Sequence, residues 1–584
     1  MVCLALGGWA VAQQPAVPVD KGGRFVLQRS AVPFMYPASQ EVYRAYGATI
    51  LCWGGGADKA AVARAHEVGV TYFASVGMVT EFSRYYERFP DSYEVALCRD
   101  VDGKPLKVPW LTDHQHKGIP YWWCCTNQPQ FRQYLEERVA ATAAAGVDGL
   151  HIDDHLGTAG CVSIGGCFCD RCVTAFREYL QALPKAQRQT LKLGDLTVFD
   201  YRQHILNWQA AQGGAQTKPW QRPLWNEWQS FHLKAAAAFM QELKQHAAKV
   251  AGRPLPMGAN AGILWYPHLV DYQALDIFVA EIDHQGESER FSTTPLFAYR
   301  LAEAMGRPLA ATASGGDWAF VKEHELDGLV RSWIAQAYAA GQYLMAPHHQ
   351  WCYTPQKGTH WYEGPQESYA PLYRFVRDHA DLFDGYQTLA EVGLVYSFGG
   401  VRRDRTPLMK AVDLLVAANV SFRMVVAGDD LLDHPLPPDE LALPALIAVE
   451  PLSLTPEDQA LLDSEAAKGR VYSTVDAALA DIKSAASVQD AAGIALSDRV
   501  HVFPRLKPGA PAVVHLINWD YDRQADDVRP ARDLRLVVRP EALRLKSVSE
   551  ATLFAPGADP QRLQVQGNTI TVPNLGLWGV LRLS

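Results

Sequence analysis

The sequence Val147-Asp148-Gly149-Leu150-His151-Ile152-Asp153-Asp154-His155 decides the fold. Successive side chains of a β-strand face opposite sides. His151 and Asp153 therefore share one face, and Leu150 and Ile152 share the other. In a barrel strand this directs His151 and Asp153 toward the barrel axis and leaves Asp154 and His155 at the mouth. The stretch therefore predicts a buried strand whose carboxyl end carries a site.

A repeated strand–helix unit surrounds this stretch. A helical pattern over 130–145, with an apolar stripe that includes Phe131, Leu135 and Val139, precedes it and ends at Gly146. Short β-branched or aromatic runs alternate with such helical patterns from residue 30 to about residue 350. Eight such strands alternating with helices predict an α/β fold, the (β/α)8 or TIM barrel. We expect the strands at 28–35, 48–54, 70–76, 148–153, 255–260, 276–282, 309–314 and 342–347.

The chain is long enough for several domains. With 584 residues it exceeds one hydrophobic core. We expect a tail or signal-peptide remnant at 1–23, a catalytic barrel at 24–388, a smaller flavodoxin- or glutaminase-like α/β domain at 389–490 and a β-sandwich at 491–584. Two long insertions, 78–128 and 155–250, follow the third and fourth strands, and insertions of this length are usually functional or form subdomains.

Composition excludes several classes of protein. The chain is 48% hydrophobic and 20% charged, with a net charge of −9 and no cluster of Lys and Arg, so a nucleic-acid partner is not expected. No segment reaches the length of about 18–20 apolar residues that a membrane span needs, so no membrane partner is expected. Ala10-Val11-Ala12 before Gln13 resembles a signal-peptidase site, which predicts a secreted or periplasmic protein.

Acidic residues follow two of the predicted strands. Asp153 and Asp154 end the fourth strand, and Glu281 and Asp283 end the sixth. Hydrolysis of a glycosidic bond needs two carboxyl groups that flank the bond. We predict Asp153 as nucleophile or base and Glu281 as general acid, because apolar neighbours raise the pKa of a glutamate. Asp154 would position substrate hydroxyls or restrain Asp153.

Two other acids compete for a catalytic role. Glu227, in Trp225-Asn226-Glu227-Trp228, has the Asn-Glu pair of many barrel glycosidases, but no strand precedes it, and a helix start is the favoured interpretation. Asp317 follows the seventh strand. Aromatic rings and His or Asn donors suit sugar faces and hydroxyl rims, and the expected substrate-binding residues are Trp53, Trp122, His151, His155, Asn260, His284, Asp317, Trp318, His348, His349 and Trp351, with Trp123 beside them.

Six of the ten cysteines lie between Cys124 and Cys172. The spacing of Cys161, Cys167, Cys169 and Cys172 suits a closed, structural Zn2+ site, with Cys124 or Cys125 as an alternative to Cys161. Two disulfides are the competing interpretation. No organic cofactor is expected.

The segment Phe168-Cys169-Asp170-Arg171-Cys172, with Phe176, Arg177, Tyr179 and Leu180, resembles the zinc–cysteine segment of family-42 β-galactosidases. The order of barrel, α/β domain and β-sandwich is similar to theirs. This resemblance implies β-galactosidase activity and a trimer, and so a homo-oligomer. The catalytic acids depart from that family, whose acid and nucleophile are glutamates after strands 4 and 7. Residues 149–153 instead resemble the fourth strand of α-amylase and α-galactosidase barrels, whose final Asp is the nucleophile.

We therefore expect a glycoside hydrolase that acts on an oligo- or polysaccharide, with a galactoside among the candidate substrates, and that retains anomeric configuration. Two rival hypotheses stay open. One is a metal-dependent hydrolase or lyase that uses His151, Asp153 and His155. The other is a non-catalytic carbohydrate-binding relative of the glycosidases.

Overall fold

The computed structural model describes residues 19, 24–213, 217–288 and 290–584. The predicted signal-peptidase site lies outside these residues. Within the described part of the chain, none of the helices is both long and apolar enough to cross a membrane.

Eight parallel strands form one sheet in the order β1-β2-β3-β6-β7-β8-β9-β10. A parallel bridge between Phe34 and Ala346 joins the two edges and closes the barrel. The strands coincide with the eight predicted ones, although the first and last are shorter than expected: β1 Pro33–Phe34, β2 Ile50–Gly55, β3 Thr71–Gly77, β6 Gly149–Asp153, β7 Met257–Asn260, β8 Ile277–Ile282, β9 Leu309–Ala313 and β10 Tyr343–Leu344. The predicted barrel is confirmed.

Helices surround the barrel because each presents an apolar stripe to the sheet. In α4 that stripe is buried and includes Phe131, Leu135 and Val139. The link between β7 and β8 has a short 3-10 turn, η4 Tyr266–Leu269, in place of an α-helix. The barrel helices are α1 Gln40–Tyr46, α2 Lys59–His66, α4 Pro129–Ala143, α9 Trp225–Ala251, α10 Thr293–Ala304, α11 Gly315–His324, α12 Asp327–Ala339 and α13 Gln366–Asp378.

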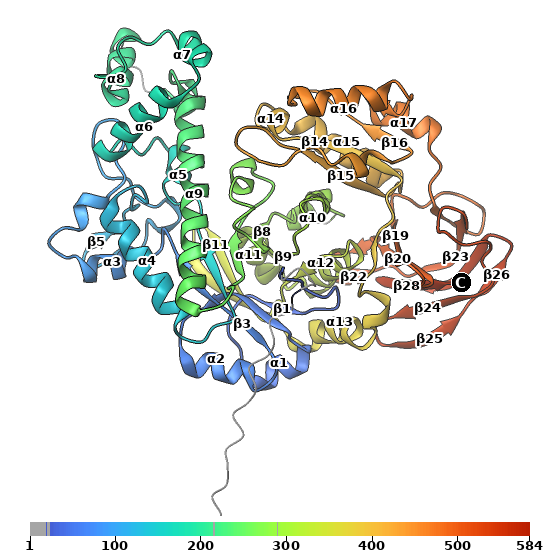
Figure 1. Cartoon of the computed structure of the whole chain (residues 1–584). Helices are drawn as coiled ribbons and strands as arrows, with labels where there is room; N and C mark the ends of the chain where they lie inside the picture. The colour runs from blue at the N-terminus through green and yellow to red at the C-terminus, as the bar shows by residue number, and fades with distance from the viewer. Residues whose placement is uncertain (1–18, 20–23, 214–216, 289) are drawn as a thin grey trace, which may run out of the picture.

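The two insertions pack together at one end of α9 (Figure 1). They have their own apolar core, in which Phe168 and Phe176 pack against Trp228. This core anchors the loop after β6 beside the barrel mouth. The insertions contain α3 Phe82–Arg88, η1 Tyr93–Ala96, η2 Pro109–Leu111, β4 Gln115–His116, β5 Ile119–Pro120, α5 Thr158–Val162, α6 Asp170–Ala182, α7 Lys185–Leu191, α8 Tyr201–Ala211 and η3 Pro219–Gln221.

A four-stranded parallel sheet, in the order β15-β14-β16-β17, follows the barrel. Figure 1 shows it above the barrel mouth, on the side opposite the insertions. Its helix α16 begins at a Thr455 cap whose side chain accepts from the Asp458 amide. The elements are β14 Val392–Ser397, α14 Phe398–Val401, α15 Thr406–Ala417, β15 Phe422–Ala427, η7 Pro438–Leu441, β16 Ala445–Ile447, α16 Pro456–Ala466, β17 Val471–Tyr472 and α17 Val475–Asp481.

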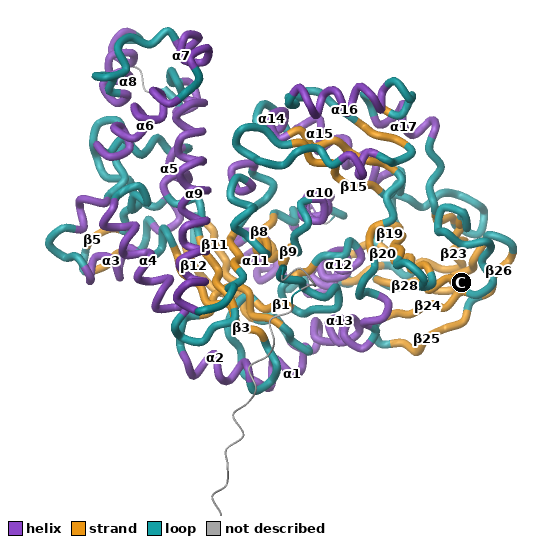
Figure 2. Tube along the Cα trace, viewed as in Figure 1, coloured by secondary structure: helices purple, strands orange, loops and turns teal. Residues whose placement is uncertain are grey.

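Antiparallel sheets form the carboxyl-terminal part, where strands replace helices (Figure 2). One has the order β13-β19-β20-β28-β24-β25 and the other β18-β23-β27-β26. Strands β13 and β18 join these sheets from outside the predicted 491–584 range, and the domain boundaries themselves stay predictions. The strands are β13 Gln387–Thr388, β18 Ala486–Gln489, β19 Val500–Leu506, β20 Ala512–Asn518, β21 Tyr521–Asp522, β22 Asp527–Val528, β23 Ala531–Val538, β24 Ala551–Ala555, β25 Ala558–Arg562, β26 Gln564–Gln566, β27 Thr569–Leu575 and β28 Trp578–Leu583.

Candidate active site

One asparagine lies between two carboxyl groups at the barrel mouth. Asp153 ends β6, Asn260 ends β7, and Glu281 is the next-to-last residue of β8. The Asn260 Nδ2 donates to Asp153 Oδ1 at 3.3 Å, and the Asn260 side chain also lies close enough to Glu281 to lower the pKa of that carboxyl group. All three side chains are partly exposed. Three neighbouring strands thus bring a base and an acid together around a shared amide.

Burial raises the pKa of Glu281 from 4.5 to about 7, and the charge of Asp153 adds to this effect. The Asn260 side chain acts in the opposite direction. A carboxyl group with such a pKa still holds its proton near neutral pH, as a general acid must.

The two aspartates that end β6 differ in their surroundings. Burial raises the pKa of Asp153, but hydrogen bonds from Asn260 and the Asp154 backbone oppose this rise. Burial, followed by the charges of Asp153 and Glu281, holds the pKa of Asp154 well above its usual range. Asp154 also has a left-handed backbone, with φ of 54°, which is uncommon outside glycine and frequent at functional sites. Asp153 is therefore the better anion, and Asp154 the better hydrogen-bond donor.

A buried histidine–carboxylate pair lies next to these acids. His155 Nδ1 and Asp271 Oδ2 are 2.6 Å apart, and both side chains are at most 1% exposed. His155 Nε2 has no hydrogen-bond partner among the described residues. It borders a pocket of about 160 Å3 whose lining includes Trp110, Trp123, Asp154, Asn260, Trp265 and His268. Three indole rings and a ring of polar groups suit a sugar residue.

Tyr36 also belongs to the mouth, just beyond β1 Pro33–Phe34. Burial, and then the charges of Asp153 and Glu281, raise the pKa of Tyr36, so its hydroxyl stays a donor. Tyr36, His268, Trp265 and Asp271 were not among the residues predicted for the site. The position of Tyr36 after a barrel strand was the available signal. The other three lie in or beside a 3-10 turn where a barrel helix is the usual expectation.

His151 and Trp53 lie inside the barrel, below the acids. The His151 side chain is fully buried and stacks on Trp53, with ring centroids 4.9 Å apart. Burial, and then the charge of His155, lowers the pKa of His151 to about 3, so this imidazole is neutral. We place both residues under the site and out of contact with substrate.

Asp317, His284 and Trp318 have structural roles. The two carboxylate oxygens of Asp317 accept from the backbone amides of His284 and Gly286, at 2.9 and 2.8 Å, and Asp317 caps α11. Trp318 is 1% exposed and donates its Nε1 to Thr312. The polar atoms of Asp317 and Trp318 are therefore satisfied within the protein. The His284 ring is buried against Trp333, and its Nε2 has no hydrogen-bond partner among the described residues.

Three predicted substrate-binding residues, His348, His349 and Trp351, lie at a hairpin that follows the last barrel strand. His349 and Trp351 are on β11 His349–Thr354, which pairs with β12 Gly358–Glu363. His349 stacks on Trp361, with centroids 4.4 Å apart, and its edge meets Tyr36. His348 is half-buried just before this hairpin.

Three further candidates lie elsewhere. Trp122 lies in the first insertion under Lys107. Asp283 is exposed and accepts from the Gln285 amide in its own turn. Glu227 lies in the first turn of α9, the predicted helix start.

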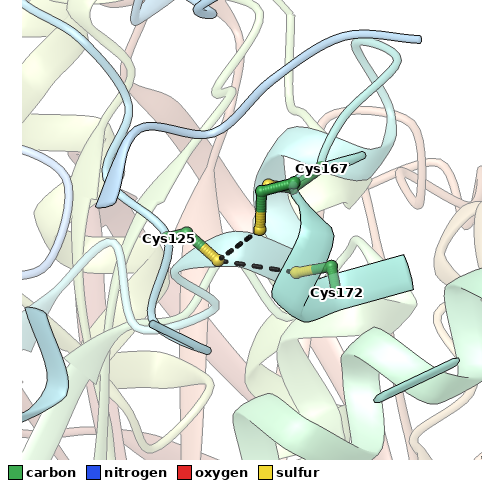
Figure 3. A group of neighbouring side chains, drawn as sticks. Cys125, Cys167 and Cys172 are labelled. Atoms are coloured by element: carbon green, nitrogen blue, oxygen red, sulfur yellow. Dashed lines mark hydrogen bonds between the residues drawn. The ribbon is translucent and has the colours of Figure 1, made fainter. Parts of the chain in front are cut away.

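Four buried thiols converge in the insertions: Cys125, Cys167, Cys169 and Cys172. Their sulfur atoms all lie within 4.8 Å of one another, and Cys125 is 3.5 Å from Cys172 (Figure 3). A tetrahedral site with Zn–S bonds of about 2.3 Å separates its sulfurs by about 3.8 Å, so the group fits a metal ion. Within the described residues, His151, Asp153 and His155 form no comparable group.

The group contains three of the four cysteines first predicted as ligands, together with Cys125, which was predicted as the alternative to Cys161. Cys161 is buried near Cys98, beside the cluster. Cys125 and Cys172 are far apart in the sequence, and they come together because the first insertion packs against the second. Amide groups of Asn127 and Gln128 point at the sulfurs of Cys172 and Cys169, at 3.4 and 3.6 Å, as donors around metal-bound thiolates do.

The fold and the mouth define the class of protein: the chain has the barrel fold of glycoside hydrolases. A β-galactosidase from Bacillus circulans sp. alkalophilus superposes with a TM-score of 0.60, covering 93% of this chain and 96% of that one at 12% identity. The predicted resemblance in architecture is thereby confirmed.

The particular relatives are α-agarases. Those of Alteromonas agarilytica and Thalassotalea agarivorans are each 23% identical to this chain, over 86% and 97% of its length. The chain spans only 36% and 41% of the length of these two relatives. No family model matches it.

Proposed function

We propose that this chain is a glycoside hydrolase that cleaves a polysaccharide, with agar as the first substrate to test. The position of Asn260, which donates to Asp153 and lies next to Glu281, carries the proposal. Two carboxyl groups that neighbour the same amide side chain lie close enough to flank one glycosidic bond. Glycosidases hold their two carboxyl groups at about 5–9.5 Å, the shorter separations being those of retaining enzymes.

In the proposed reaction, Glu281 protonates the glycosidic oxygen as the bond breaks. Asp153 stabilises the positive charge that develops at the anomeric carbon, as the nucleophile of a retaining enzyme. Asp153 forms a covalent bond to that carbon as the leaving group departs. Water, which gives a proton to Glu281, then attacks the same carbon and displaces Asp153. Protonated Asp154 and Tyr36 donate hydrogen bonds to substrate hydroxyls, and the indole-lined pocket next to His155 takes a neighbouring sugar ring.

The four thiols would hold a structural Zn2+, which supplies no open coordination position and no step of the reaction. The ion would pin the loop that follows β6. We also propose, from the amino-terminal sequence, that the protein is exported, and from the resemblance to family-42 enzymes, that it forms a homo-oligomer.

The test is release of reducing ends from agarose and from a panel of aryl α- and β-glycosides. Asp153→Asn and Glu281→Gln should each abolish turnover. Glu457→Gln, an exposed glutamate on α16, is the matched control and should keep full activity. Full activity of either site variant, in protein with wild-type circular dichroism, would remove that residue from the mechanism. Sugar binding without turnover in the wild type would favour the non-catalytic hypothesis.

A further inference from the structure

A loop of the α/β domain reaches over the barrel mouth. This loop, residues 398–405, lies between the end of β14 and the start of α15 and includes the short helix α14. The Phe398 ring meets the edge of Tyr266, with centroids 5.8 Å apart. Arg405 Nη1 donates to the Leu264 carbonyl at 2.6 Å. Residues 264 and 266 follow β7, so the loop touches the segment that links two strands of the site.

The loop is held in place within its own domain. Ser397 Oγ accepts from the Gly400 amide at 3.2 Å and from the Ser453 amide at 2.9 Å, and donates to the Ser453 carbonyl at 2.8 Å. A Cβ on Gly400 would lie 2.0 Å from the Pro451 carbonyl oxygen, so only glycine allows this approach. These contacts therefore fix the backbone of the loop, from which the side chains at its end extend.

Further contacts fix the α/β domain against the barrel. Lys234 on α9 pairs with Asp430 at 3.1 Å. The Tyr272 hydroxyl donates to the Asp433 carbonyl at 2.8 Å. Both aspartates follow the loop in the sequence, so a second segment of the α/β domain also contacts the barrel.

Loop and barrel together line an open cavity of about 580 Å3. Glu281 and Trp265 are among the barrel residues that line it, and the charged residues that line it from the loop are Arg403, Asp404 and Arg405. The proposed general acid is thus part of the wall of this cavity. It is distinct from the indole-lined pocket, although Trp265 and His268 border both.

The charged side chains of the loop differ in the partners that they have. Arg402 pairs with Asp429 at 3.0 Å, and Asp404 accepts from the Thr406 amide. The Arg405 guanidinium bonds a neutral carbonyl. Arg403 is exposed, and its guanidinium has no acidic partner among the described residues. A guanidinium presents five donors in a planar fork that matches carboxylate and sulfate-like oxyanions.

We propose that Arg403 and Arg405 form a subsite for an anionic substituent of the polysaccharide, on the Glu281 side of the bond that is cleaved. The substituent is a sulfate ester or a carboxylate, since both present paired oxygens to the fork. This inference rests on the proposed function for the identity of the polymer. It goes further by naming the charge of the substrate and by making the α/β domain part of the binding site.

The test measures binding, so it does not depend on turnover. The probes are neutral agarose oligosaccharides, sulfated galactan oligosaccharides and oligogalacturonates of equal length, titrated calorimetrically into the full chain carrying Asp153→Asn. We expect one anionic series to bind at least about tenfold more tightly than the neutral one at low salt, and to lose this advantage at high salt. Preference for the sulfated series identifies a sulfate subsite, and preference for the galacturonates a carboxylate subsite.

Adding Arg403→Gln should remove most of that tenfold preference and leave the neutral series unchanged. Lys410→Gln, which removes one exposed positive charge from α15 of the same domain, is the matched control and should keep it. Equal affinity for neutral and anionic probes, or equal losses in the two variants, would overturn the subsite. Hydrolysis of neutral agarose by the wild-type chain separately tests the proposed function.

Discussion

Replacing Glu281 with glutamine should stabilise the folded protein at alkaline pH while it abolishes hydrolysis. In the folded chain, burial and then the charge of Asp153 raise the pKa of Glu281 from 4.5 to about 7. The folded state therefore disfavours the carboxylate. The difference between the two pKa values corresponds to about 3 kcal/mol. Because the side chain is partly exposed, solvent reduces this to about 1–3 kcal/mol.

The sign follows from linkage. The folded pKa lies above the unfolded one, so the contribution of Glu281 to stability is fully present below about pH 4.5 and is lost as the pH rises through about 7. Glutamine does not ionise and loses nothing over this range. We expect equal melting temperatures for wild type and Glu281→Gln at pH 4, and a variant that melts a few degrees higher at pH 8.

Calorimetric melting of wild type, Glu281→Gln and Glu457→Gln between pH 4 and pH 9 measures this difference. The exposed Glu457 controls for loss of one carboxylate. An offset between Glu281→Gln and wild type that is the same at every pH would refute the raised pKa. A variant less stable than wild type at pH 8 would refute it as well.

Three other changes test the site and its support. Asn260→Ala should move both limbs of the pH profile of kcat/KM upward by about one pH unit, because the asparagine side chain lowers the pKa of both carboxyl groups; an unmoved profile would contradict the shared amide. Cys125→Ser should lose bound metal, measured by mass spectrometry of the native protein, whereas Cys161→Ser should keep it; the reverse result would restore the ligand set expected from sequence. Asp271→Asn should lower the free energy of unfolding in urea by about 2 kcal/mol, because it weakens a buried pair with His155; unchanged stability would show that the pair is replaceable.

The barrel was predictable because its signals are local. Each strand is a short apolar run bounded by a turn, and each helix has a 3.6-residue stripe. The same alternation placed His151 and Asp153 on one face, and parallel strands deliver their carboxyl ends to one mouth. Asp153 and Glu281 could therefore be paired although they are far apart in the chain.

Burial and hydrogen bonding at the loop ends were not predictable in this way. Asp317 follows a strand as Asp153 does, yet its oxygens accept backbone amides and it caps α11. Trp318 is an aromatic residue at a strand end, yet it lies in the core. The same residue types occur at strand ends whether they bind a substrate or cap a helix, so only the tertiary structure distinguishes the two roles.

The sequence by itself determined the class of fold, the order of the elements and the two acids proposed for catalysis, because periodicity and strand ends are properties of neighbouring residues. Only the tertiary structure decided which cysteine completes the thiol cluster, which amide joins the two acids, and which arginines border them. Cys125 joins the other thiols because the two insertions pack together, and Arg403 borders the cavity of Glu281 because the α/β domain packs on the barrel. No local pattern encodes such meetings, since they depend on how separately formed layers pack against one another.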